Sequence, residues 1–144
     1  MLGTASDEGD PNAKDPINKV SDRVSAVVAF VAPTDLRIMV NDAPDRLPAY
    51  ARFPALTLDM KSAEAGSPLV HVTPDDPPTL LIAGDQDDLV PITHSRNMQA
   101  AFEKANVESR LIEVAGAGHG FQGEDAKKSN EEMVSWFVSQ LATP

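Results

Sequence analysis

The chain has 144 residues, of which 42% are hydrophobic, and it contains no cysteine. This length and composition suit one folded domain and exclude disulfides, thiol nucleophiles and cysteine-bound metals. The net charge of -10 opposes binding to nucleic acid or anionic membrane, and we find no apolar stretch long enough to cross a bilayer. The cellular compartment stays open, because a cysteine-free chain suits any compartment.

The first predicted element is a strand over Val24–Ala32, which is almost continuously apolar and rich in β-branched residues. Such a run is typical of a parallel strand that is buried on both faces, so we expect it to be central in its sheet. Residues 33–78 are rich in proline and predict a loop-rich excursion. One short helix is expected there, within Leu56–Glu64.

Two more strands follow, over Thr79–Ala83 and Arg110–Val114, each entered from a turn and left through glycine. Between them, apolar residues recur at helical spacing and predict a helix with one face on the sheet. Asn106 is the expected end of this helix. The apolar positions are Met98, Ala101, Phe102 and Ala105.

The last predicted helix begins at Ser129, because Ser129 and Glu132 have the spacing of a capping box. Its apolar stripe, interpreted as core packing, is Met133, Trp136, Phe137 and Leu141. The alternation of strands and helices predicts the α/β class, with about three parallel strands sandwiched by helices. We expect a single unit over residues 1–144.

Two loop motifs carry the candidate catalytic residues Asp87 and His119. The first, after one strand, is Gly84-Asp85-Gln86-Asp87-Asp88-Leu89-Val90-Pro91, and the second, after the last strand, is Gly116-Ala117-Gly118-His119-Gly120-Phe121. Because the carboxyl ends of parallel strands meet at one edge of a sheet, we expect Asp87 and His119 to face each other. A carboxylate orients an imidazole and stabilises its charged form while the other ring nitrogen moves a proton. The pattern predicts that Asp87 orients the His119 ring and that His119 moves the proton.

An acid followed by a base in this chain order is the second half of a Ser, Asp, His triad. The serine nucleophile that would complete this triad is missing from the sequence. None of the serines lies in the Gly-x-Ser-x-Gly elbow that exposes a nucleophile between a strand and a helix. We therefore expect the serine and the oxyanion hole to come from a segment upstream of Met1. The chain alone should have little activity.

The polar residues around these motifs also have structural interpretations. A histidine between glycines can simply occupy a solvated turn, and Asp85 and Asp88 can lie at the N-terminus of the next helix, where the helix dipole favours negative charge. These acids lack the spacing of a calcium loop, so we expect no metal. We interpret His71 and His94 as surface residues and Asp35 as part of an Asx turn.

The two motifs resemble the esterase and lipase branch of the α/β-hydrolases, near the prolyl oligopeptidase-like and dienelactone hydrolase-like families. Asp87 matches the acid of that branch and His119 its base. Ser21–Leu36 is similar to the strand and Pro-Thr-Asp-Leu loop that follow the nucleophile-bearing helix, and Met1–Thr4 looks like the last turn of that helix. The resemblance implies the C-terminal part of such a hydrolase, acting without a cofactor.

Two functions from different classes stay open. In the first, the parent protein cleaves a small-molecule carboxylic ester through an acyl-enzyme, or is a prolyl oligopeptidase-like peptidase. In the second, the chain is a truncated or split module without catalytic activity that self-associates or binds a partner. Because the expected neighbour of Val24–Ala32 is missing, that strand should form an apolar edge through which the chain becomes a homo-oligomer.

Overall fold

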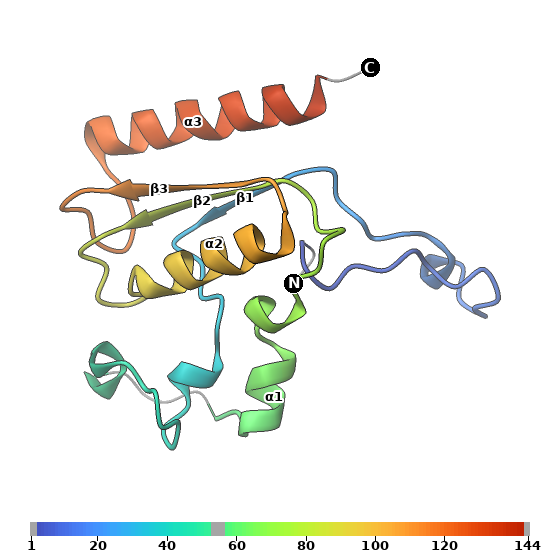
Figure 1. Ribbon diagram of the computed structural model, residues 1–144, viewed down its shortest axis with the longest axis horizontal. Coiled ribbons are helices and arrows are strands. Elements are labelled where there is room, and N and C mark those ends of the chain that lie inside the picture. Colours follow the sequence, from blue (N-terminus) through green and yellow to red (C-terminus); the bar gives the residue numbers. More distant parts are fainter. Residues whose placement is uncertain (1–2, 53–56, 143–144) are drawn as a thin grey trace.

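The computed structural model describes residues 3–52 and 57–142, so Met1, Leu2 and Leu56 lie outside the described residues. The strands β1 (Val27–Phe30), β2 (Thr79–Gly84) and β3 (Ser109–Val114) form one parallel sheet in the order β1-β2-β3. The helices α2 (Thr93–Ala105) and α3 (Gly123–Leu141) cover opposite faces of the sheet (Figure 1). This arrangement confirms the predicted α/β class.

The central strand β2 connects the two halves of the core. All of its residues are buried, because helices cover both faces of the sheet. Leu80 and Ile82 pack with Trp136 of α3, whereas Leu81 packs on the α2 side with a separate cluster. That second cluster contains Met98, Phe102 and Val107.

Two helix boundaries differ in how well the sequence predicts them. Asn106 ends α2 as expected, with a left-handed φ of 58°. The prediction that the last helix begins at Ser129 is wrong, since α3 starts at Gly123. Gln122 has the extended conformation of an N-cap residue, and acidic side chains occupy the first turn, where they suit the helix dipole. Leu141, predicted on the core stripe, lies in the last turn of α3 and is 56% exposed.

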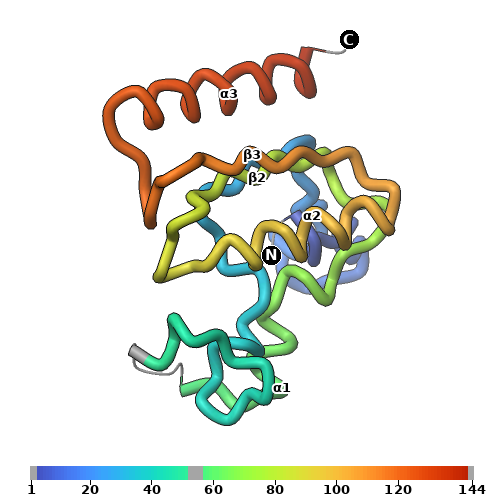
Figure 2. The backbone as a smooth tube through the Cα atoms, turned by 60° about the vertical axis from the view of Figure 1, so that its left-hand side comes forward, coloured from blue at the N-terminus to red at the C-terminus, as the bar shows by residue number. Residues whose placement is uncertain are grey.

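The proline-rich segment 33–78 forms the expected loop-rich excursion. It contains 3-10 turns at Arg37–Met39, Pro48–Arg52 and Pro68–His71, together with the short helix α1 (Met60–Ala65). Asp59 caps α1 by accepting a hydrogen bond from the backbone N–H of Ser62. Figure 2 shows this excursion on the α2 side of the sheet, away from α3.

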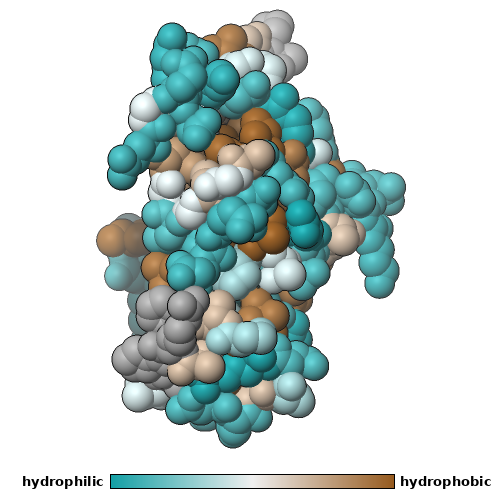
Figure 3. All heavy atoms as spheres, turned by 90° about the vertical axis from the view of Figure 1, so that its left-hand side faces the viewer, coloured by the Kyte–Doolittle hydropathy of each residue, from teal (hydrophilic) through white to brown (hydrophobic). Residues whose placement is uncertain are grey.

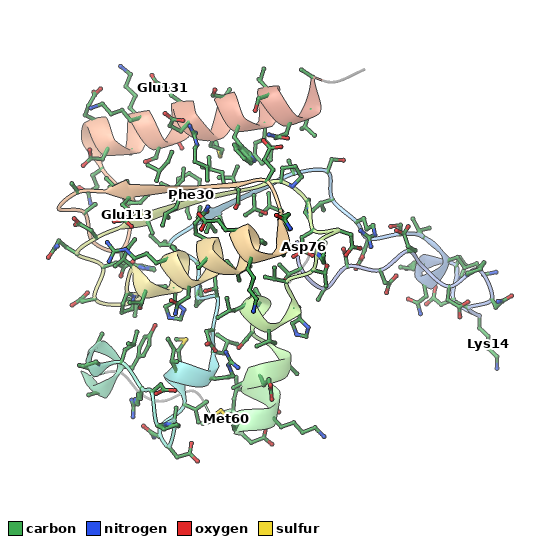
Figure 4. The ribbon with its side chains drawn as sticks, viewed as in Figure 1. Lys14, Phe30, Met60, Asp76, Glu113 and Glu131 are labelled. Atoms are coloured by element: carbon green, nitrogen blue, oxygen red, sulfur yellow. The ribbon has the colours of Figure 1, made fainter. Side chains whose placement is uncertain are left out.

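Ahead of β1, a long loop forms an arm that projects from the rest of the chain, with Lys14 at its far end (Figure 4). A backbone hydrogen bond from Asp10 to Asn18 and another from Asp22 to Asp7 hold the arm together. Of the described helices, none is both long and apolar enough to span a membrane.

The strand β1 is shorter than the predicted Val24–Ala32 strand, and it lies at the edge of the sheet with half-buried residues. The N–H groups of Val27 and Val31 donate at 2.9 Å to carbonyls in and just before β2. Because backbone groups alternate in direction along a strand, those of Val28 and Phe30 face outward. Between residues 3 and 142, leaving out 53–56, no backbone hydrogen bond reaches this outer side.

We expect the 144-residue chain to form dimers or larger assemblies, because an open apolar edge is a template for strand pairing with a second copy. The net charge of -10 opposes association, so the assemblies should strengthen as salt is added. Size exclusion coupled to light scattering measures both effects. Ala26→Pro removes an outward N–H just before β1 and should favour the monomer. A folded monomer at high protein and salt concentration would contradict the prediction.

Candidate active site

The carboxyl ends of β2 and β3 bring two polar loops together. Gly84 at the end of β2 pairs in register with Val114 at the end of β3, so both loops leave the sheet at the same edge. The Asp87 loop follows β2 and the glycine-flanked His119 loop follows β3. Figure 3 looks onto this side of the molecule and shows a mainly hydrophilic surface. Hydrophobic residues gather below α3, which is the uppermost helix in Figure 1.

Asp87 and His119 form the contact that the sequence predicts. The Nδ1 atom of His119 lies 2.9 Å from Oδ2 of Asp87. A carboxylate oxygen can only accept, so Nδ1 carries a proton and donates it. The other oxygen, Oδ1, accepts the N–H groups of Leu89 at 2.9 Å and Val90 at 2.8 Å. The Asp87 side chain is fully buried, whereas the His119 side chain is 38% exposed, so solvent and ligands can reach the ring.

The neighbouring Asp85 takes a different role from the one predicted. Asp85 accepts a hydrogen bond at 2.7 Å from the backbone N–H of Gly116, so it holds the loop that carries His119. The expected role at a helix N-terminus is wrong for Asp85, because α2 begins only at Thr93. Asp88 is exposed at the surface.

A close backbone contact at Gly84 joins the two loops. A Cβ atom on Gly84 would lie 2.2 Å from the carbonyl oxygen of Ala117 and 2.6 Å from that of Gly118. The same Ala117 oxygen accepts the N–H of Gln86 at 2.9 Å. The sequence predicts a turn at Gly84, but only the structure reveals that the loops meet there.

A second polar cluster surrounds His94, which we predicted at the surface and which is in fact 1% exposed. Its Nδ1 atom accepts the backbone N–H groups of Thr34 at 3.2 Å and Asp35 at 3.3 Å, and its Nε2 atom bonds to the hydroxyl of Tyr50. Burial lowers the pKa of His94, although the charges of Asp35 and Asp87 oppose this. Burial also raises the pKa of Tyr50 to about 12, with the charge of Asp87 as a second cause.

The helical spacing contains a signal for this burial, because His94 lies four residues before the buried Met98. The Asx turn predicted at Asp35 is confirmed, since Asp35 accepts the backbone N–H of Arg37 at 3.1 Å. The guanidinium of Arg37 also bonds the carboxylate and lowers the pKa of Asp35. His71 is half-buried and lies 2.9 Å from the carbonyl of Ala65.

In the described part of the chain, no serine hydroxyl bonds to His119, and no cluster of three metal-binding side chains includes it. All serines lie within the described ranges, and none of them bonds to the His119 ring. Among these residues, no three His, Asp or Glu side chains are placed to hold a metal ion. The site therefore contains a paired acid and base without a nucleophile beside them.

A BD-FAE family model matches residues 1–102, and no curated protein matches the chain. The acetyl ester-xyloside bifunctional hydrolase from Caldicellulosiruptor lactoaceticus is similar over 96% of this chain and 50% of its own, at 23% identity and a TM-score of 0.78. A truncated carbohydrate esterase from gut microbiota matches over 88% of this chain and 46% of its own, at 26% identity and a TM-score of 0.67. A puromycin-hydrolyzing peptidase of Mycobacterium tuberculosis matches over 83% of this chain and 19% of its own, at 20% identity and a TM-score of 0.63.

The chain thus spans about half the length of the first two of these proteins. The likeness over most of this chain identifies its sheet as part of an α/β-hydrolase fold. It confirms the resemblance seen in the sequence motifs.

Gly84→Ala should lower the free energy of unfolding by about 1–3 kcal/mol or more, because the added Cβ meets backbone atoms that cannot move away cheaply. Gly118→Ala is the matched control, since the nearest atom to its Cβ would lie 3.9 Å away. Urea denaturation of both variants measures the difference. Equal stability of the two variants would contradict the close contact.

The free energy of unfolding should fall as the pH drops below about 6.5, the ordinary histidine pKa, because the unfolded chain then protonates His94 while the folded chain resists. The loss attributable to this residue is at most about 1.4 kcal/mol per pH unit. His94→Asn retains an acceptor and removes the titration, so its pH profile should be flatter. Urea denaturation over a pH series measures both profiles, and parallel profiles would contradict the assignment.

Proposed function

The chain belongs to the BD-FAE family, and we propose that its parent protein hydrolyses carboxylic esters with a triad in which Asp87 is the acid and His119 the base. The observation that carries the proposal is the 2.9 Å contact between these two residues at the shared carboxyl edge of β2 and β3. The serine and the oxyanion hole come from sequence outside these 144 residues.

The geometry suits proton transfer by the free nitrogen of His119. With Nδ1 bonded to Asp87, the lone pair of Nε2 accepts the serine proton as the serine oxygen attacks the ester carbonyl. His119 then returns that proton to the leaving alcohol, which leaves an acyl-enzyme. Water attacks this ester by the same route and releases the acid. The N–H groups of Leu89 and Val90 hold the Asp87 carboxylate in place throughout.

The named neighbours support an ester as the substrate. One is an acetyl ester-xyloside hydrolase and another a carbohydrate esterase, each similar to most of this chain. The puromycin-hydrolyzing peptidase favours a peptidase as the second candidate, although this chain corresponds to only 19% of its length. A small-molecule carboxylic ester is therefore the proposed substrate class.

The 144-residue chain alone should hydrolyse a short activated ester at a rate close to the uncatalysed background. Losing the nucleophile removes most of the acceleration of such a triad, and losing the oxyanion hole removes the remainder. His119→Ala should leave this low rate unchanged. Robust turnover that His119→Ala abolishes would mean that one of the serines present, or a water activated by His119, does the chemistry.

The proposal for the parent protein is tested on the gene and then on its product. The coding sequence upstream of Met1 should contain a strand, a Gly-x-Ser-x-Gly elbow and a helix that runs into Leu2. The protein that includes this segment should hydrolyse esters, and His119→Ala or Asp87→Asn should reduce kcat by several orders of magnitude. An upstream sequence without the elbow, or activity indifferent to both variants, would contradict the proposal.

A further inference from the structure

The buried His94 follows the loop between β2 and α2 that carries Asp87, called the acid loop below. His94 takes no direct part in the contact between Asp87 and His119. It occupies the first turn of α2, which begins soon after that loop. Its ring accepts two N–H groups from the loop that follows β1, and its own carbonyl accepts the hydroxyl of Thr34 at 2.8 Å. These bonds fix the start of α2 to a segment about sixty residues away in sequence, a link that local geometry alone cannot supply.

The bonding of the ring assigns its proton. Because Nδ1 accepts the N–H groups of Thr34 and Asp35, the proton of the neutral ring is on Nε2. Nε2 therefore donates to the hydroxyl oxygen of Tyr50, which is itself only 3% exposed. With both nitrogens occupied and 1% of the residue exposed, His94 cannot act on a substrate.

The acid loop is short and fixed at both ends. Its first end leaves the buried strand β2, and Asp87 folds it by accepting the N–H groups of Leu89 and Val90. Its second end leads through Pro91, whose carbonyl accepts the N–H of His94 at 3.0 Å. A shift of the first turn of α2 would therefore move the carboxylate of Asp87.

We propose that His94 is a positioning residue for Asp87, the acid of the triad. This inference rests on the proposed function. The neutral ring clamps the start of α2 against the loop after β1 and against Tyr50. This clamp holds Asp87 within hydrogen-bond distance of His119 and keeps water away from the buried carboxylate. The proton on Nδ1 of His119 thus depends on a second histidine that it does not touch.

The test reads the His119 ring by 15N NMR in the folded chain at mildly alkaline pH. Selective labelling of histidine gives the ratio of the Nδ1–H to the Nε2–H form of His119. Replacement of His94 by leucine removes every ring hydrogen bond of the clamp. We expect this ratio to fall about tenfold in His94→Leu, the change that corresponds to losing about 1.4 kcal/mol, close to the value of one charge-assisted hydrogen bond.

Three further variants separate positioning from general stability. His94→Asn can retain an acceptor for the N–H groups of Thr34 and Asp35, so its ratio should stay near that of the unmutated 144-residue chain. Tyr50→Phe removes one oxygen and should give an intermediate ratio, which keeps the test valid if His94→Leu does not fold. Met98→Ala is the control on the same helix, because it destabilises the core without touching the clamp, and its ratio should not change.

Two outcomes overturn the inference, and a third concerns the proposed function instead. The inference is overturned if both His94→Leu and Tyr50→Phe keep the ratio of the unmutated chain, or if Met98→Ala lowers the ratio equally. Either result would mean that His94 only contributes to the packing of the core. Asp87→Asn should itself lower the ratio. If it does not, the pair of Asp87 and His119 is not operative and the proposed function fails; if it does while the His94 variants do not, only the positioning role fails.

Discussion

The arrangement of the loops at the carboxyl ends of β2 and β3 depends on the carboxylate of Asp87. This carboxylate is fully buried, and a buried charge is tolerated only when hydrogen bonds replace the water it has lost. The backbone N–H groups of Leu89 and Val90 bond one oxygen, and the His119 ring bonds the other. The turn after β2, the start of α2 and the approach of the β3 loop are all arranged around these three bonds.

The sheet gives the acid and the base opposite environments. Asp87 follows the central strand, which is buried on both faces, and its carboxylate is shielded from solvent. His119 follows an edge strand and is partly exposed, with glycines on both sides. A residue that only orients can be enclosed, whereas a residue that moves protons to a substrate must be reached. The difference in burial between the two side chains agrees with the roles that we propose for them.

The sequence predicts this pair because the rule behind it is topological. Strands that run parallel finish at one edge, so residues placed just after β2 and β3 meet wherever their side chains allow. The start of α3 could not be predicted in the same way. The capping pattern at Ser129 is local, yet tertiary packing buries that residue inside a longer helix.

His94 shows a different limit of prediction from sequence. A polar residue on the first turn of a helix suggests the surface, but its partners Thr34 and Tyr50 lie far away in sequence. No local pattern records such bonds. For β1, the apolar run alone predicts a central strand, which is wrong, whereas the missing neighbour of Val24–Ala32 predicts the edge position that the structure shows.

The contact at Gly84 fixes the spacing of the two loops, at the point where they leave the sheet, through main-chain atoms. The loops touch there through the carbonyl of Ala117 and the N–H of Gln86. Residues that line the space in front of His119 can therefore change over evolution while this spacing is kept. Under the proposed function, a scaffold of this kind can acquire new substrates by changes in its rim.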